Sequence, residues 1–69
     1  MKRQEGFERV AQKQRTRNAL LEAARELLAE GRHPTIAEAA DRATISRATA
    51  YRYFSTPEAM AQEAVLDAI

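Results

Sequence analysis

The chain has 69 residues, enough for one small domain or part of one, which excludes a multi-domain enzyme, a closed barrel and a doubly wound α/β fold. Two glycines and two prolines among abundant alanine, glutamate, arginine and leucine favour an all-α fold, and with no cysteine and one histidine we expect no disulfide, no metal and no cofactor. The net charge is only +1, but residues 1–17 carry six basic and two acidic groups, and residues 42–56 hold three arginines and no acid. This distribution fits an anionic partner met on one side or, alternatively, an ordinary solvated surface.

Residues 1–15 are polar and contain Gly6, so they predict a flexible basic N-terminal arm that becomes helical toward its end. No apolar stretch typical of a secretory signal follows the N-terminus, and no apolar run approaches the roughly 20 residues that span a bilayer. We therefore expect a cytoplasmic chain with no membrane partner.

A first helix is expected from about Thr16 to Glu30, although it could begin earlier, near Phe7 or Val10. Gly31 fits the position just after the helix, where φ is positive. The apolar residues repeat at helical spacing and form one stripe, made of Leu20, Ala24, Leu27 and Leu28.

The second helix is predicted at about Ile36 to Arg42, after a connector in which His33 has no chemical partner and is interpreted as a loop residue. Thr35 and Glu38 form a capping box, because the hydroxyl can accept from the Glu38 amide and the carboxylate can reach back. Free N–H groups and a hydroxyl at this helix start also favour an anion, and the two roles do not exclude each other. The expected inward residues are Ile36, Ala39 and Ala40.

Residues 43–45 are expected to form a turn, after which Ser46 caps a third helix from about Arg47 to Phe54. At about 100° per residue, Ala50 and Phe54 share the inward face of this helix.

A fourth helix is predicted from Pro57 to Ile69, with Thr56 or Ser55 as its cap. Its inward residues are expected to be Met60 and Ala64. Three further apolar residues have no obvious partner, namely Val65, Leu66 and Ile69.

Two short helices joined by a three-residue turn are typical of a helix-turn-helix, whose second helix enters the DNA major groove, about 12 Å wide. The outward face of the third helix is small and polar, with Ala48, Thr49 and Arg52 flanked by Arg47, Tyr51 and Tyr53. Small residues let the helix approach the base edges, and the arginines can pair with guanine or grip phosphates. Alternatively, the aromatic residues at this spacing are core residues; we expect this for Phe54 and leave Tyr51 and Tyr53 open.

Roughly residues 10–69 resemble the N-terminal DNA-binding domain of TetR-family transcriptional repressors. The residues that carry the resemblance are Ala24, Gly31, Thr35-Ile36-Ala37-Glu38-Ala39-Ala40, Ile45-Ser46, Thr49, Tyr51-Arg52-Tyr53-Phe54 and Glu58-Ala59-Met60, and 46–54 is the most specific stretch. The resemblance implies a homeodomain-like three-helix bundle at 16–56, with the helix-turn-helix at 35–54. The fourth helix at 57–69 would then lead to a larger helical domain, so that this chain is a fragment of a longer regulator.

The resemblance also implies a homodimer that recognises a palindromic double-stranded DNA operator. A small-molecule inducer, bound in the further domain, would release the homodimer from the operator. By position, it assigns DNA contacts to Thr35, Ser46, Arg47, Ala48, Thr49, Tyr51 and Tyr53. To these we add Arg52 from the outward face and, as a DNA-binding arm, Lys13, Arg15 and Arg17.

Three residues depart from the family pattern. Thr44 stands where the family has glycine, so the turn either avoids positive φ or is strained by of order 1 kcal/mol. Ala50 replaces a larger apolar residue, which predicts looser packing under the third helix. Pro57 replaces a lysine that meets DNA phosphate, and proline removes both that ammonium and one N–H from the start of the fourth helix.

An alternative is a small helical protein-interaction module that docks through the fourth helix. This alternative gives no reason for the acid-free segment 42–56. We expect no enzyme, because the sequence holds no nucleophile–base pair and no glycine-rich phosphate loop.

Overall fold

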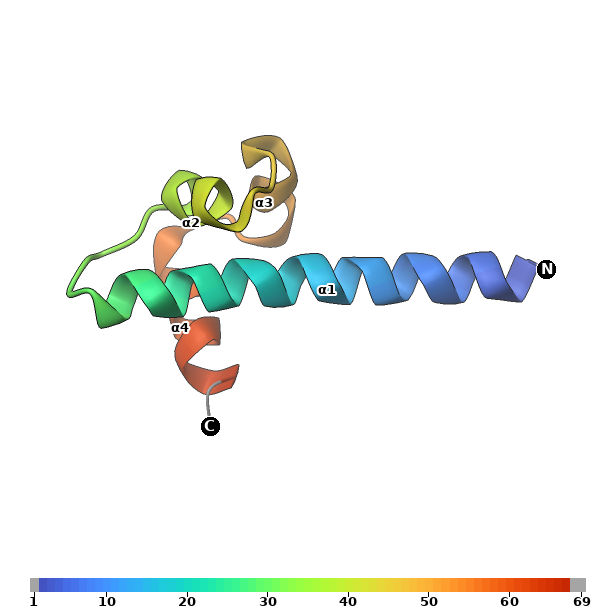
Figure 1. Cartoon of the computed structure of the whole chain (residues 1–69), viewed down its shortest axis with the longest axis horizontal. Helices are drawn as coiled ribbons and strands as arrows, with labels where there is room; N and C mark the ends of the chain where they lie inside the picture. Colours follow the sequence, from blue (N-terminus) through green and yellow to red (C-terminus); the bar gives the residue numbers. More distant parts are fainter. Residues whose placement is uncertain (1, 68–69) are drawn as a thin grey trace.

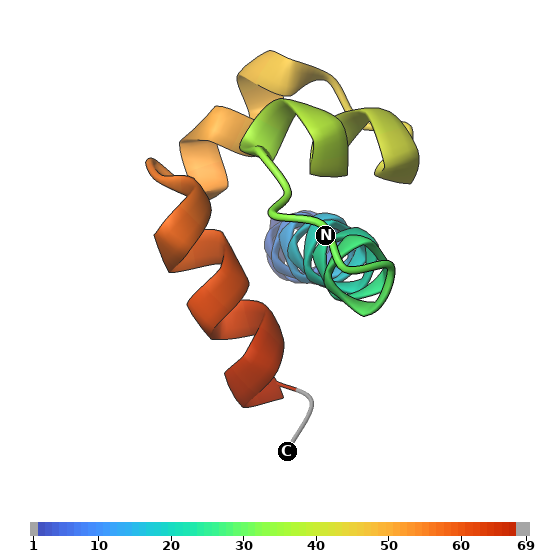
Figure 2. The same ribbon diagram turned by 90° about the vertical axis from the view of Figure 1, so that its left-hand side faces the viewer.

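The computed structural model describes the backbone of residues 2–67 and the side chains of residues 9–66. Four α-helices and no strand make up the described chain, which confirms the predicted all-α class. The helices are α1 (Lys2–Ala29), α2 (Ile36–Ala43), α3 (Arg47–Tyr53) and α4 (Pro57–Asp67). The pair α2–α3 lies on one side of α1, and α4 crosses α1 beside that pair (Figure 1). Viewed along α1, the pair and α4 cover two adjacent sides of it (Figure 2).

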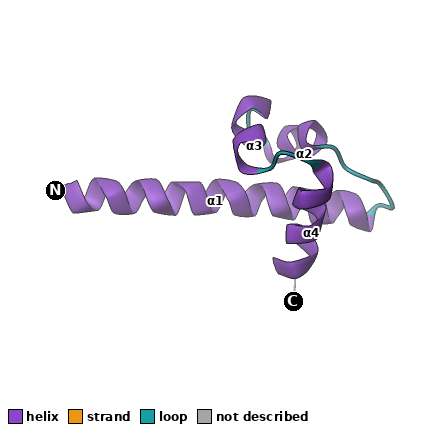
Figure 3. Cartoon of the chain, turned by 180° about the vertical axis from the view of Figure 1, so that it is seen from behind, coloured by secondary structure: helices purple, strands orange, loops and turns teal. Residues whose placement is uncertain are grey.

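The first helix is longer than expected. It runs without a break from Lys2, so the start predicted at about Thr16 is wrong, and the backbone of residues 2–15 is helical rather than an irregular arm. Gly6 is the only strong helix-disfavouring residue there, at a cost of about 1 kcal/mol, and its neighbours favour helix. Most of this half of α1 extends beyond the other three helices, so it has no core to face and carries no apolar stripe (Figures 1 and 3). The remaining division of the chain into domains stays a prediction.

The core is built from all four helices. The predicted inward residues of α2, α3 and α4 are buried, including Ala50, Met60 and Ala64 at 0% exposure. In α1, Leu28 is only half-buried, while Leu21 and Ala23 are buried outside the predicted stripe. The buried arc of α1 is wider than one stripe, since two sides of the helix are covered. The core residues of α1 are Leu20, Leu21, Ala23, Ala24 and Leu27.

Local chemistry sets the helix ends as predicted. Gly31 has a φ of +80°, and the amides of Gly31 and Arg32 donate to the carbonyls of Leu28 and Leu27, which closes α1. Thr35 and Glu38 form the capping box: the Glu38 amide donates to the Thr35 hydroxyl at 3.0 Å, and the Thr35 amide donates to the carboxylate at 2.9 Å.

The turn between α2 and α3 is strained at one residue. Thr44 lies in the left-handed region, with φ 58° and ψ 43°, which is the strained alternative of the two expected. Its amide donates to the Asp41 carbonyl and the Ile45 amide donates to the Ala40 carbonyl, so two carbonyls of the last turn of α2 are satisfied. This tight ending turns the chain sharply and sets the direction of α3.

α4 is capped by Thr56, whose hydroxyl accepts from the Ala59 amide at 3.1 Å. Its predicted C-terminal residue, Ile69, lies outside the described residues. Val65 and Leu66 are more than half exposed, as expected of residues without a partner. No helix of the described chain is long and apolar enough to cross a membrane.

Candidate functional site

The cap of α3 is a compact hydrogen-bonded unit. The Ser46 hydroxyl accepts from the Thr49 amide at 3.1 Å and donates to the Thr49 hydroxyl at 2.8 Å. This fixes the first turn of α3, and burial of Ala50 and Phe54 then fixes the rotation of the helix about its axis. The opposite face is thereby turned outward.

The outward face of α3 has the character that the sequence predicts. Ala48, Tyr51 and Arg52 are exposed, and Thr49 is half-buried. The two tyrosines, which the sequence left open, differ in exposure: Tyr51 is 54% exposed, whereas Tyr53 is half-buried and packs against the core. Tyr53 therefore supports α3 with its ring, and Tyr51 is the freer of the two.

α1 and α3 share a hollow. Lys13 of α1 and Thr49, Arg52 and Tyr53 of α3 line an open depression with a volume of ≈ 330 Å³. Its lining provides an ammonium, a guanidinium and two hydroxyls, all of which can donate to an oxyanion. Arg52 has no hydrogen-bond or ion-pair partner among the described residues, so its donors face solvent. The hollow thus joins the predicted arm to the predicted outward face.

Arg47, the first residue of α3, is held by a carboxylate. Its Nε donates to Asp41 Oδ1 at 3.2 Å and its Nη2 donates to Asp41 Oδ2 at 2.7 Å. These hydrogen bonds lower the pKa of the Asp41 carboxyl and raise the pKa of the Arg47 guanidinium, so both groups are charged near neutral pH. The spacing of six residues across a turn gave no signal for this pair in the sequence.

The three arginines of the acid-free segment therefore differ. Arg42 reaches back to the end of α1: Glu30, the residue after the helix, accepts from Nη1 at 2.5 Å and from Nη2 at 3.3 Å, and Glu26 of α1 lies 3.8 Å from Nη1. Arg42 thus links α2 to the end of α1 and contributes no free charge. Arg47 is paired with Asp41 of α2, whereas Arg52 has no hydrogen-bond or ion-pair partner among the described residues.

Of the remaining predicted contacts, Thr35 is exposed, but its amide and hydroxyl both serve the capping box. Arg15 is exposed on α1. Arg17 is not placed with Lys13: it donates to Glu63 of α4 at 2.8 Å and is half-buried in the contact between α1 and α4. Its assignment to a DNA-binding arm therefore does not fit its position, and we leave Arg17 out of the candidate site.

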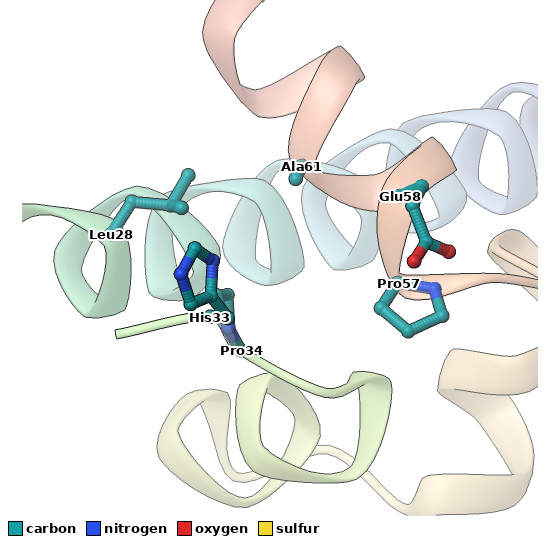
Figure 4. A pocket seen from close by; sticks show the side chains of 6 residues that line it. All are labelled: Leu28, His33, Pro34, Pro57, Glu58 and Ala61. Carbon is teal, nitrogen blue, oxygen red and sulfur yellow. The ribbon is translucent and has the colours of Figure 1, made fainter. Parts of the chain in front are cut away.

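A second hollow, of ≈ 110 Å³, lies where the connector after α1 meets the start of α4 (Figure 4). Its two ionisable residues, His33 and Glu58, do not point at one another. Pro57 is half-buried there, at the first position of α4. Within the described residues there is no group of histidine and acidic side chains that could hold a metal ion.

Comparison with known protein families finds a match. A family model described as "Bacterial regulatory proteins, tetR family" matches residues 20–64, about two thirds of the chain. The match begins at the first core residue of α1 and ends at the last core residue of α4. No curated protein and no solved structure matches the chain significantly.

Proposed function

The chain belongs to the tetR family of bacterial regulatory proteins, a family of DNA-binding regulators and not of enzymes, and we propose that it binds double-stranded DNA sequence-specifically with α3 in the major groove. One observation carries this proposal: the outward face of α3 is slim at Ala48 and basic at Arg52, with Lys13 of α1 beside it. A helix inserted along this face meets base edges, while the flanking cations meet the phosphates.

The proposed contacts divide into two groups. Ala48 and Thr49 face the bases, where the small methyl groups allow close approach to the thymine methyl. Arg52, Tyr51 and Lys13 face the phosphate backbone, because their exposed donors surround the outward face. Further contacts are proposed for Arg15, Thr35, Ser46, Arg47 and Tyr53.

We further propose that the chain acts in the cytoplasm as the DNA-binding domain of a repressor that recognises a palindromic operator as a homodimer. A seven-residue recognition helix spans only one half-site, so recognition of a whole operator would need two copies one helical turn of DNA apart or a multiple of it. The exposed Val65 and Leu66 on α4 support a continuation that covers them in a longer protein. The inducer would bind in that further part.

Titration of a fluorescent duplex at two salt concentrations tests the proposal. Affinity should fall steeply with salt, with a log–log slope of about −0.9 per neutralised phosphate. Arg52→Ala should weaken binding and make that slope shallower by about 0.9, without loss of helix content, because Arg52 has no hydrogen-bond or ion-pair partner among the described residues. Arg32→Ala, the comparison variant, removes the same charge from the connector between α1 and α2, where Arg32 pairs with Glu38, and should have a smaller effect. Salt-independent binding, or equal effects of both variants, would contradict the proposal.

The second candidate function is a protein-interaction module that docks through α4. Val65 and Leu66 favour it, since they are exposed and adjacent. It leaves the hollow of Lys13, Thr49 and Arg52 unexplained. A partner that binds α4 and leaves α3 free would be the finding in its favour.

A further inference from the structure

Asp41 is an unexpected acid beside the proposed DNA-facing surface. It lies in the last turn of α2, and its carboxylate contacts Arg47, one of the residues proposed to meet DNA. A carboxylate in this place repels phosphate, so its charge alone should weaken DNA binding. The presence of Asp41 beside the proposed DNA-facing surface therefore needs another explanation.

The contribution of the pair to stability is too small to explain it by itself. The side chains of Arg47 and Asp41 are 62% and 56% exposed, and an ion pair so exposed to water adds little to stability. The two helices that the pair joins are already held together by the apolar core, to which Ala39, Ala40 and Ala50 belong.

The geometry of the pair decides which part of Arg47 is left for DNA. Asp41 occupies the side of the guanidinium formed by Nε and Nη2. The end formed by Nη1 and the second Nη2 proton stays available, and two parallel donors of this kind match O6 and N7 of guanine. Holding one side also removes rotational freedom, so that less entropy is lost when the other end binds. Because the Asp41 carboxylate is bonded to the guanidinium, it also opposes movement of Arg47 onto a phosphate.

We propose that Asp41 is a positioning residue that directs Arg47 onto a guanine edge in the major groove and away from the phosphate backbone. This inference rests on the proposed function and deepens it. Arg47 becomes the specificity-determining arginine, whereas Arg52 and Lys13, which Asp41 does not contact, remain the phosphate-binding cations.

Selection of bound duplexes from a pool with a randomised centre, at low salt, tests the inference. The wild-type chain should enrich guanine at one position, and Arg47→Ala should lose that preference. Asp41→Asn keeps the shape but removes the charge, and it should lose discrimination at the same position by about 10-fold or more. Its binding to random duplexes should be equal or tighter, with a salt slope steeper by up to about 0.9, because Arg47 is then free to contact a phosphate.

Glu30→Gln is the matched control, since it breaks a similar exposed pair, that of Glu30 with Arg42, away from α3. It should leave the base preference unchanged. Asp41→Glu retains the charge and should show more of the guanine preference than Asp41→Asn does. A merely structural role of Asp41 would not predict this difference between the two variants. The NMR signal of the Arg47 Nε–H reports whether the pair forms in the absence of DNA. This proton should be protected from exchange with solvent in the wild type and unprotected in Asp41→Asn.

The outcomes separate this inference from the proposed function. A wild-type chain that selects a sequence while Asp41→Asn retains the full guanine preference overturns the inference and leaves the function standing. An Arg47 Nε–H that exchanges like that of a free arginine in the wild type overturns it as well. A wild-type chain that binds no duplex at low salt overturns both.

Discussion

Among single residues, Thr44 is the one non-glycine residue of the described chain with a positive φ. It occupies a left-handed conformation, which for an L-residue with a branched Cβ costs about 1–2 kcal/mol. The hydrogen bonds of the Thr44 and Ile45 amides to the end of α2 hold it there. The turn is retained because the burial of Ile36, Ala50 and Phe54 on either side of it depends on this change of direction.

Replacing Thr44 by glycine should stabilise the chain. Glycine adopts positive φ without steric cost but loses more backbone entropy on folding, so we expect a net gain of about 0.5–1 kcal/mol in the free energy of unfolding. Urea denaturation followed by circular dichroism measures it. Ala37→Gly, at a helical position of α2, is the control and should destabilise by about 1 kcal/mol. A lower unfolding midpoint for Thr44→Gly would show that the threonine is not strained.

Among the elements, α4 is held to α1 by an apolar seam with polar edges. Met60 and Ala64 are fully buried, the Arg25 guanidinium donates to the Ala64 carbonyl at 3.2 Å, and Arg17 pairs with Glu63. The Ala64 carbonyl lies in the last turn of α4, where carbonyls lack helical partners, so Arg25 also caps that end. α4 is thus part of the folded unit and not a loose extension of it.

Met60→Ala should therefore destabilise the whole fold. Truncation of a fully buried methionine costs about 2–5 kcal/mol, a large share of the stability of so small a chain. Thermal unfolding followed by circular dichroism should show a much lower midpoint. Leu66→Ala, in the exposed part of the same helix, should change the free energy of unfolding by no more than about 0.5 kcal/mol. Equal effects of the two variants would mean that α4 does not pack as described.

Across the whole molecule, carboxylates bonded in the folded state make stability depend on pH. Folding lowers the pKa of Glu30, Glu38 and Asp41 below their ordinary values of 4.5, 4.5 and 3.8. The main causes are, in that order, hydrogen bonds from the Arg42 side chain, the Thr35 amide and the Arg47 side chain. Because the folded pKa is the lower one, their stabilisation is fully present above the unfolded values and is lost as the pH falls through the folded values.

Urea denaturation should therefore show stability falling from about pH 5 to about pH 2. The triple variant Glu30→Gln, Glu38→Gln, Asp41→Asn should be less stable at neutral pH and should lose less on acidification, since it lacks the groups that titrate. A wild type as stable at the acid end as at neutral pH would contradict the hydrogen-bond assignments. So would a triple variant that loses as much as the wild type.

Helix ends and inward faces could be predicted from the sequence because short-range chemistry determines them. Gly31, Thr35 and Ser46 act within three residues of their own positions, and helical spacing identifies Ala50 and Phe54 as buried. The start of α1 could not be predicted in this way, because helix propensity without an apolar stripe gives no boundary.

Contacts between helices could not be predicted from the sequence. Whether Arg17 meets DNA or Glu63 depends on where α4 crosses α1, and the partner of Arg47 depends on the angle of the turn at Thr44. The outward position of Ala48 and Arg52 was therefore predicted correctly from the sequence, but the partners of the arginines were not, and the DNA contacts stay a prediction.

Chemical-shift mapping of the isotope-labelled chain with duplex DNA tests the central claim most directly. Added DNA should shift the amides of residues 46–53, together with that of Lys13 across the shared hollow, while residues 60–66 change little. Shifts confined to 60–66, with 46–53 unmoved, would contradict major-groove binding by α3 and favour docking through α4.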